Sequence, residues 1–286
     1  MSLSCFHAVK RTTTEYNNRP KATVLYVDAV FVGDRSGSME SMGSAPVEGA
    51  IEFMTKYKDF GKSNKNKTVV EFISFDNEPT ISFSGEAKNI DNQVLNNIRL
   101  NMRPRNCTRL YDTAIKSIER QQMRVDNYYK QLSKEVMRLK PSIAVSFTLL
   151  TDGVDNMSSK TARDLNRSIK KHKNNYNAVC FFAAANQDAI SIGNKYGFSQ
   201  DTSLQMSSNK EQARNAFRAC TNSALRCASQ ECSSYTQAER DESFNYIDED
   251  DYATDNDYSD YNGGCAQRAY GGNYSQEYQD YDDVDD

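Results

Sequence analysis

The sequence predicts an α/β fold: a doubly wound, mostly parallel sheet with helices on both faces, Rossmann-like in its organisation. Two observations predict it. Four apolar runs rich in Val, Ile and Phe have the length of buried parallel strands, and stretches with helical spacing separate them. The runs cover residues 22–32, 68–75, 143–150 and 178–185. Sheets of this kind place binding sites at the carboxyl ends of their strands, so the loops after the runs are the segments to search.

Four helices are expected between and after these runs. The first opens near Pro46, since proline suits the first turn of a helix. One stripe of this helix carries Val47, Ala50, Ile51, Met54 and Tyr57. The second runs from about residue 111 past 132, in one or two pieces, and the third covers about 160–171. The last spans about 209–228, and its inward residues are Ala213, Ala216, Phe217, Cys220 and Ala224.

A hairpin is expected directly after the first helix. Residues 71–75 and 80–83 are both apolar and are separated by the turn-forming segment Asn77-Glu78-Pro79. This pattern predicts an antiparallel strand added at the edge of the sheet.

The charge distribution divides the chain into three parts. Residues 1–21 form a polar N-terminal extension that we leave unassigned, and residues 22–228 form the predicted domain. From residue 229 the sequence has almost no aliphatic residues, and residues 231–286 hold 17 Asp and Glu against 2 Lys and Arg. Nine of the 17 tyrosines lie in this last part. Such a segment buries too little apolar surface to offset its ordering entropy, so we expect a disordered acidic tail joined to a basic body.

The lack of a recognisable targeting signal and the pattern of cysteines predict an intracellular, cytoplasmic protein. No apolar run reaches the roughly 18–20 residues of a membrane-spanning helix, and Asp28 interrupts the longest run. The N-terminus lacks the apolar stretch of a signal peptide. The seven cysteines are irregularly spaced, without a C-x-x-C pair, which predicts reduced thiols and argues against zinc.

A divalent-cation site is predicted at the end of the first apolar run. That run leads directly into Asp34-Arg35-Ser36-Gly37-Ser38. A carboxylate and two hydroxyls at alternate positions of a tight loop can converge on one hard cation, which prefers oxygen ligands. Taken alone, the pattern also fits a Ser/Gly-rich turn with an Asp helix cap.

Two further segments support the metal interpretation. Thr108 lies in a loop where the second long helix begins, and Thr151-Asp152-Gly153 ends the third apolar run. Each has an ordinary structural explanation, an N-cap for Thr108 and an Asp-Gly turn for Asp152. All three segments, however, fall at a strand end or a helix start. Their joint occurrence favours one shared site.

These three segments resemble the loops of the metal-ion-dependent adhesion site of von Willebrand factor type A domains. The resemblance covers about residues 22–227 and includes the segment 183–189, which is similar to stand-alone members from bacteria, phages, large viruses and microbial eukaryotes. It implies Mg²⁺ or Mn²⁺ bound directly by Ser36, Ser38 and Thr108, with Asp34 and Asp152 acting through water. Related proteins usually have a small residue before the threonine, where this chain has Asn106-Cys107.

Such a site leaves a coordination position open, and the carboxylate of a partner's Asp or Glu is the natural ligand for it. We therefore expect a cation-dependent protein-binding module and not an enzyme. No histidine lies near the loops, and no nucleotide-binding P-loop or G-x-G-x-x-G motif is present. A metal-dependent hydrolase stays an alternative, which turnover of phosphate esters would reveal.

The distribution of charge along the chain suggests two other partners. Residues 62–67 and 170–173 are rich in lysine, and a nucleic-acid-binding or scaffold protein is an alternative, although ordinary solvated loops explain these lysines as well. The acidic tail offers an intramolecular partner, either for the basic surface or for the metal. The tyrosines of the tail fit acidic phosphorylation sites and a solubilising tail equally. No membrane partner is expected.

Overall fold

The protein contains one six-stranded sheet, seen in a computed structural model that describes residues 24–105, 107–138, 141–185 and 188–244. The strand order is β3-β2-β1-β4-β5-β6. β3 is antiparallel to β2, and the other neighbouring strands are parallel. The strands are β1 (Val24–Asp34), β2 (Lys67–Phe75), β3 (Pro79–Glu86), β4 (Ser142–Thr151), β5 (Val179–Ala184) and β6 (Ser203–Gln205). The predicted α/β class and the antiparallel hairpin are confirmed.

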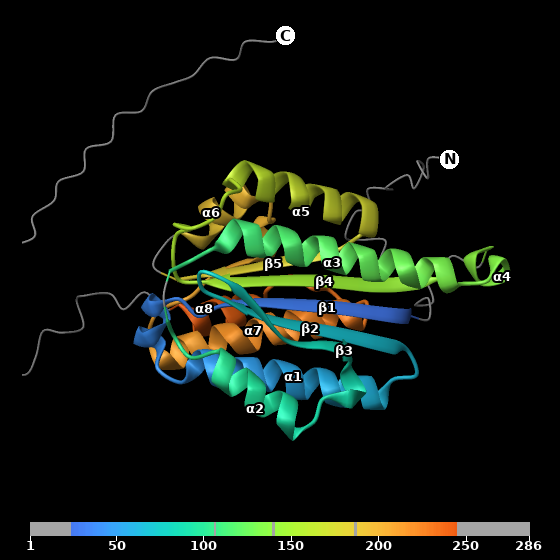
Figure 1. Cartoon of the computed structure of the whole chain (residues 1–286), viewed down its shortest axis with the longest axis horizontal. Helices are drawn as coiled ribbons and strands as arrows, with labels where there is room; N and C mark the ends of the chain where they lie inside the picture. Colours follow the sequence, from blue (N-terminus) through green and yellow to red (C-terminus); the bar gives the residue numbers. More distant parts are fainter. Residues whose placement is uncertain (1–23, 106, 139–140, 186–187, 245–286) are drawn as a thin grey trace, which may run out of the picture. The chain divides into compact units, whose positions relative to one another are not determined.

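Helices cover both faces of the sheet (Figure 1), with α1, α2, α7 and α8 on one side and α3, α5 and α6 on the other. The long helices are α1 (Ala45–Ser63), α2 (Asn92–Asn101), α3 (Leu110–Gln131), α5 (Ala162–Tyr176) and α7 (Lys210–Ala228). The short ones are η2 (Gly37–Met42), η3 (Ala87–Asn89), α4 (Lys134–Arg138), α6 (Ala189–Tyr196), η4 (Gln200–Thr202) and α8 (Gln237–Ser243).

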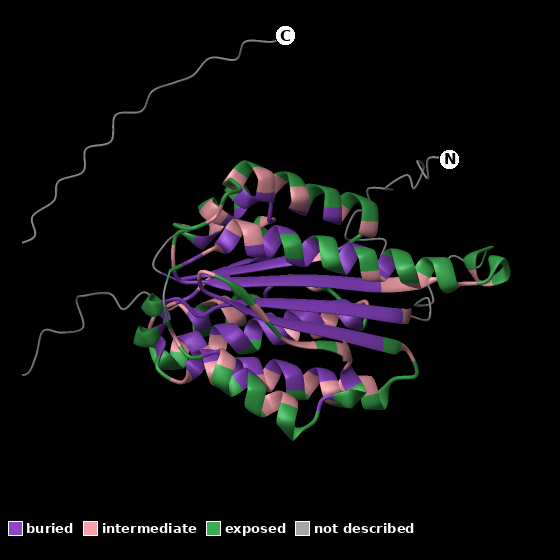
Figure 2. Cartoon of the chain, in the orientation of Figure 1, coloured by how far each residue is buried: buried purple, intermediate pink, exposed green. Residues whose placement is uncertain are grey.

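Two apolar clusters, one on each face of the sheet, form the core. Figure 2 shows β1, β2, β4 and β5 as almost entirely buried between the helices, whereas the edge strand β3 is partly exposed. Successive strand residues point to opposite faces, so Phe31 packs in the cluster beneath α1 and α7 while Val32 packs beneath α3. Where α1 meets α7, a Cβ on Gly49 would lie 2.3 Å from the Phe217 ring, so only glycine permits this helix contact.

The helix stripes are confirmed in part. All five predicted inward residues of α7 are buried. In α1, Ala50, Met54 and Tyr57 are buried as predicted, whereas Val47 and Ile51 are only half-buried and line a groove on the outer side. Both still pack against the core at the margin of the buried stripe, which is centred on Phe53 and includes Gly49.

The predicted end of the domain at residue 228 is wrong. Residues 229–244 continue the folded unit and include α8, which packs against α7 and β6. Tyr235 is buried against Phe181, and Arg240 donates to the carbonyl oxygens of Ser203 and Asp201 at 2.7 and 3.1 Å. Hydrogen bonds and one buried ring, not an apolar stripe, hold this polar segment. The N-terminal extension and the rest of the predicted tail lie outside the described residues.

The strand order places one loop cluster at a switch point. From β1 the chain moves outward to β2 and β3, and then crosses back through α3 to β4 on the other side of β1. β1 is paired with β4 up to Gly33 and Leu150, so Asp34 and Asp152 leave the sheet at adjacent carboxyl ends. Open α/β sheets bind their ligands at such switch points.

Two findings bear on the predictions about membrane-spanning helices and about the cysteines. Among the described residues, no helix combines the length and the apolar character needed to cross a membrane. The cysteines within the same residues are free thiols: Cys107, Cys180, Cys220, Cys227 and Cys232.

Candidate metal centre

The loop after β1 brings three oxygen-bearing side chains together. Asp34, the last residue of β1, is fully buried, and its Oδ1 accepts the Ser36 N–H at 2.7 Å. This bond turns the chain sharply into η2, which begins at Gly37. The hydroxyls of Ser36 and Ser38 then lie 3.1 Å apart. The turn therefore brings the Asp34 carboxylate and the two hydroxyls together, as the alternate spacing of the motif predicts.

The loop after β4 joins this group through two hydrogen bonds. The Ser38 hydroxyl donates to Asp152 Oδ1 at 2.8 Å. The Thr151 hydroxyl donates to Asp34 Oδ2 at 2.6 Å, so the last residue of β4 orients the carboxylate at the end of β1. The two predicted acidic residues thus belong to one connected cluster.

The third loop contributes Thr108, which is buried. It is bonded to Asn156 twice: its N–H donates to the Asn156 side chain at 2.9 Å, and its carbonyl accepts the Asn156 N–H at 3.0 Å. The residue at the N-cap of α3 is Arg109 and not Thr108, so helix capping does not explain the Thr108 side chain. Cys107, which directly precedes Thr108, is exposed.

Gly153 marks the space that the three loops surround. A Cβ on this glycine would lie 3.6 Å from Thr108 Oγ1 and 3.7 Å from Ser38 Oγ. One methyl-sized volume is thus in contact with hydroxyls from two separate loops. All five predicted ligands, Asp34, Ser36, Ser38, Thr108 and Asp152, are brought to this region by the fold.

The two carboxylates are desolvated, and one oxygen of Asp152 has no hydrogen-bond partner. Burial raises the pKa of Asp34 to about 6, although hydrogen bonds from Thr151 and Ser36 oppose the shift and the nearby charge of Asp152 adds to it. Burial also raises the pKa of Asp152, against the bond from Ser38. The second oxygen of that carboxylate, Asp152 Oδ2, is buried without a hydrogen-bond partner. Buried polar atoms without partners are rare and call for an explanation.

The chain provides no cation for these acids within the described residues. The one basic side chain in the motif, Arg35, is fully buried but faces away from Asp34. Its guanidinium donates to the Asn101 carbonyl and the Thr80 hydroxyl, each at 2.8 Å, and pairs with Asp76. The negative charge of the site is therefore left for an external cation.

The donor set fits a hard divalent cation. It combines neutral hydroxyls with two carboxylates, all oxygen, and an orphaned acceptor at Asp152 Oδ2. Mg²⁺ binds in this way, with few protein carboxylates and several retained waters. No group of three or more His, Cys, Asp or Glu suited to a metal occurs in the described part of the chain, so a cation held here would need the hydroxyls as ligands.

Four positioning residues escaped the sequence-based prediction: Thr151, Arg35, Asp76 and Asn156. Asp76 connects two loops, since its carboxylate holds Arg35 and Arg105 while its carbonyl accepts the Arg109 N–H. The positioning role of Thr151 could have been predicted, because this residue directly precedes Asp152 at a strand end. The role of Asp76 had no signal in the sequence, since it depends on contacts between segments far apart in the chain.

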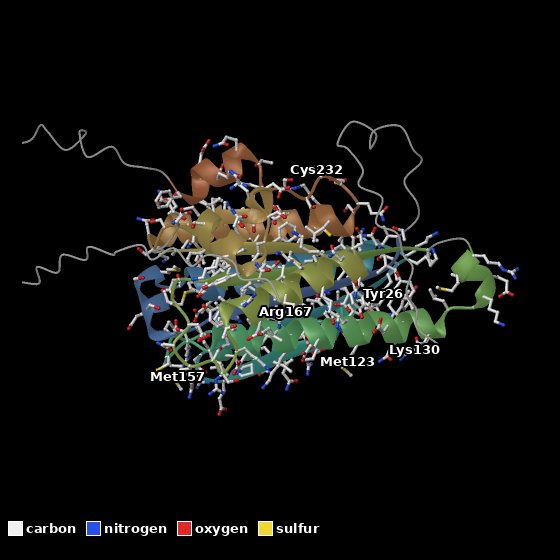
Figure 3. The ribbon with its side chains drawn as sticks, turned by 90° about the horizontal axis from the view of Figure 1, so that it is seen from above. Tyr26, Met123, Lys130, Met157, Arg167 and Cys232 are labelled. Atoms are coloured by element: carbon white, nitrogen blue, oxygen red, sulfur yellow. The ribbon has the colours of Figure 1, made fainter. Side chains whose placement is uncertain are left out.

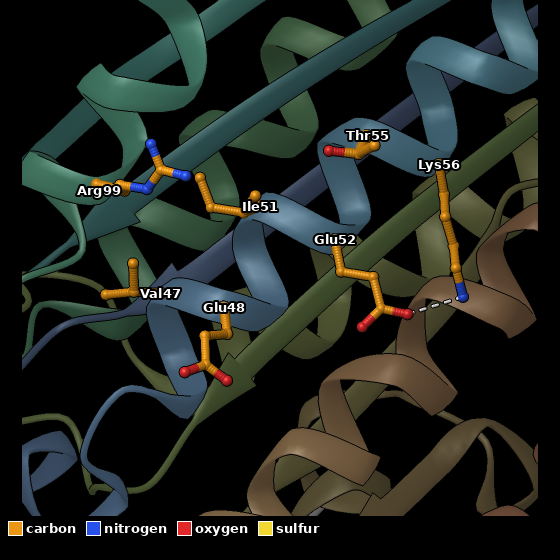
Figure 4. A pocket seen from close by; sticks show the side chains of 7 residues that line it. All are labelled: Val47, Glu48, Ile51, Glu52, Thr55, Lys56 and Arg99. Carbon is orange, nitrogen blue, oxygen red and sulfur yellow. Dashed lines mark ion pairs between the residues drawn. The ribbon is translucent and has the colours of Figure 1, made fainter. Parts of the chain in front are cut away.

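A groove of about 430 Å³ lies along the outer side of α1 (Figure 4) and contains none of the five ligands. Val47 and Ile51 are its apolar residues. Its carboxylates are paired within the chain, Glu52 with Lys56 at 2.8 Å and Glu48 with Arg214. We assign no ligand to it.

Comparison with known proteins supplies structural likenesses only. No family model and no curated protein matches the sequence. Among solved structures, proximal thread matrix protein 1 from the mussel byssus is 16% identical, with 71% of this chain and 46% of that chain covered and a TM-score of 0.45. The same protein has been solved with a zinc-occupied MIDAS motif, at 15% identity and a TM-score of 0.45, again with 71% and 46% coverage.

Two bacterial structures are similar to the same extent. A von Willebrand factor type A protein from Catenulispora acidiphila is 16% identical over 71% of this chain and 43% of that chain, with a TM-score of 0.42. The vWF domain of the type V pili tip protein Mfa5 from Porphyromonas gingivalis is 12% identical over 73% of this chain and 97% of its own, with a TM-score of 0.46. The chain thus matches less than half the length of the mussel and Catenulispora proteins.

Proposed function

We propose that this chain is a von Willebrand factor type A module that binds a protein partner through a divalent cation, Mg²⁺ or Mn²⁺. Ser36, Ser38 and Thr108 are the direct ligands, and Asp34 and Asp152 complete the site. The coordination position left open takes a carboxylate from an Asp or Glu of the partner.

One observation carries this proposal: two buried carboxylates and three hydroxyls converge at a switch point without a cation from the described residues. Burying an uncompensated charge is costly, and Asp152 Oδ2 has no donor. A bound dication removes both costs. Neutral hydroxyls neutralise little of its charge, which supports binding of an anionic ligand at the open position.

We further propose binding without catalysis. His172, the histidine among the described residues, lies on α5 and not at the site. Its Nε2 is 2.9 Å from Oε1 of Gln121 on α3. The described residues therefore offer no histidine as a general acid or base near the proposed metal. The lysine-rich segments 62–67 and 170–173 lie near the start of β2 and the end of α5. They are thus at the amino ends of the parallel strands, opposite to the candidate site. They support no role for nucleic acid at this site.

The test is a calorimetric titration of Mg²⁺ and Mn²⁺ into the full chain and into Asp34→Ala and Ser36→Ala. We expect saturable binding to the parent chain and none to either variant. Ser41→Ala is the matched control, since Ser41 is an exposed hydroxyl of η2 that donates only to the Ser38 carbonyl. It should bind the cation like the parent chain.

A second readout separates site loss from misfolding. Ligand binding to the folded state at a concentration of about 100 Kd raises the free energy of unfolding by about 2.7 kcal/mol. The parent chain and Ser41→Ala should show this gain, while the two site variants should unfold cooperatively without it. Equal stabilisation of all four proteins by Mn²⁺ would place the cation elsewhere and contradict the proposal.

A further inference from the structure

Two large apolar side chains stand exposed on the loop that follows Asp152. Val154 is 67% exposed and Met157 is 41% exposed. Figure 3 shows Met157 at the outer edge of the molecule, toward the end where the metal-site loops gather. Single exposed apolar residues are common on protein surfaces, but these two lie two and five residues beyond a proposed metal ligand.

The loop holds these side chains in place. Between them, Asp155 accepts the Tyr111 N–H at 3.0 Å and the Met157 N–H at 3.2 Å. The neighbouring Asn156 makes the two bonds to Thr108 described above. The backbone between Val154 and Met157 is therefore held by the same contacts that position Thr108. A surface fixed in this way loses little conformational entropy when it is covered.

The space beside the loop adjoins the proposed metal ligands. Gly153 has no side chain, and a Cβ at this position would contact the hydroxyls of Thr108 and Ser38. A carboxylate entering there brings the residues before and after it in its own chain onto the 153–158 loop. Arg103, on the segment leading to Thr108, is also exposed and favours an acidic chain over a basic one.

We propose that the partner segment presents an Asp or Glu flanked by a large aliphatic side chain, which packs on Val154 and Met157. The carboxylate supplies the cation dependence, and the aliphatic neighbour supplies selectivity among acidic segments. This inference rests on the proposed function, because the metal fixes where the partner's carboxylate sits.

The experiment uses two capped pentapeptides with Glu at the centre and either Gly or Leu on both sides. Their affinities for the full chain loaded with Mn²⁺ are measured from the paramagnetic broadening of their proton resonances. The leucine peptide should bind about tenfold more tightly, as partial burial of aliphatic surface provides. The double variant Val154→Thr/Met157→Gln should bind both peptides alike, at the affinity of the glycine peptide, and should keep the Mn²⁺ affinity of the parent chain.

Leu100→Gln is the matched control, because Leu100 is 58% exposed on α2 and lies outside the loop. It should retain the tenfold preference. Equal, Mn²⁺-dependent binding of both peptides to the parent chain would overturn this inference and leave the proposed function intact. A leucine preference that persists in the double variant would overturn it too. Peptide binding that is absent or independent of Mn²⁺ would overturn both.

Discussion

Asp28 and Glu71 lie in the middle of β1 and β2, whereas Asp34 and Asp152 lie at the carboxyl ends of β1 and β4. All four carboxylates are buried. The first pair faces arginines of α3, and the second faces hydroxyls. Because an ionised carboxylate is costly to bury unless it is paired, the first pair is complete within the chain and the second is not.

The inner pair is bonded almost to saturation. Arg124 donates to both oxygens of Asp28, each at 2.9 Å, and to Glu71 Oε2 at 2.9 Å. Arg120 pairs with the other oxygen of Glu71, and Gln121 donates to Asp28 Oδ1 at 3.0 Å. Two acids thus face two guanidinium groups. Similar burial therefore has two outcomes: the inner pair anchors α3 to the sheet, and the pair at the strand ends has no cation among the described residues.

The largest effect should follow removal of the inner cation. In Arg124→Met, Asp28 and Glu71 lose their shared partner, and breaking a buried pair costs about 3–5 kcal/mol. Urea unfolding of the metal-free chain measures this loss. Arg167→Met is the control, since its side chain is 73% exposed and its pair with Asp164 is local. A loss below about 1 kcal/mol in Arg124→Met would mean that water solvates the inner acids and that the contrast between the pairs is false.

The two regions should respond to acid with opposite signs. Burial lowers the pKa of His172 to about 4, and this residue joins the inner cluster through Gln121. The unfolded state then binds more protons between pH 6.5 and 4, so His172 makes stability fall as the pH falls. In the metal-free chain the pKa of Asp34 is raised from 3.8 to about 6. The folded state binds more protons between these values, so Asp34 makes stability rise as the pH falls.

Each contribution amounts to about 3 kcal/mol at most, at 1.36 kcal/mol for each unit of pKa. Relative to the parent chain, His172→Gln should gain stability at pH 4.5 over pH 7, and Asp34→Asn should lose it. Urea midpoints of the metal-free proteins at both pH values provide the measurement. If both variants keep the parent's pH dependence, neither group is buried in the state we describe.

The sequence predicted the elements that are continuous in apolar character and missed those that are not. The four apolar runs became β1, β2, β4 and β5 with boundaries within a few residues. α2 escaped because Ile98 is its one buried residue, which leaves no stripe to detect. For α8 a local signal existed, the capping box between Thr236 and Glu239. The loss of aliphatic residues hid it.

The two acidic residues of the candidate site were predicted from strand ends, and its hydroxyls from the spacing of the motif and from the start of the second long helix. Asp34 and Asp152 each come at the end of an apolar run, and a parallel sheet brings such ends together. What the sequence could not give is where Arg35 points. A basic residue inside the motif was compatible with neutralising Asp34, and only the contacts with Asp76, Thr80 and Asn101 show that it does not.

A smaller effect should result from releasing that arginine. In Asp76→Asn, Arg35 loses its charged partner and becomes available to Asp34, where it competes with the metal. Changes to residues that support ligands lower metal affinity by about tenfold or more. Mn²⁺ calorimetry measures the change. Asp126→Asn is the control, because Asp126 lies on α3 far from the loops and accepts a hydrogen bond from the Tyr176 hydroxyl at the end of α5. An unchanged Mn²⁺ affinity would show that Asp76 does not help to keep the site free of cations from the chain.

The smallest effect on stability should come from adding one methyl group at the site. In Gly153→Ala the new Cβ lies at ordinary contact distance from Thr108 and Ser38, so the metal-free chain should change by less than about 0.5 kcal/mol. Gly49→Ala is the matched comparison, because its Cβ would overlap the Phe217 ring at 2.3 Å and overpacking costs about 1–3 kcal/mol. Urea unfolding of both variants tests the difference. Equal losses would show that the space beside Thr108 is packed as tightly as a helix contact, and that the site offers an incoming carboxylate no room.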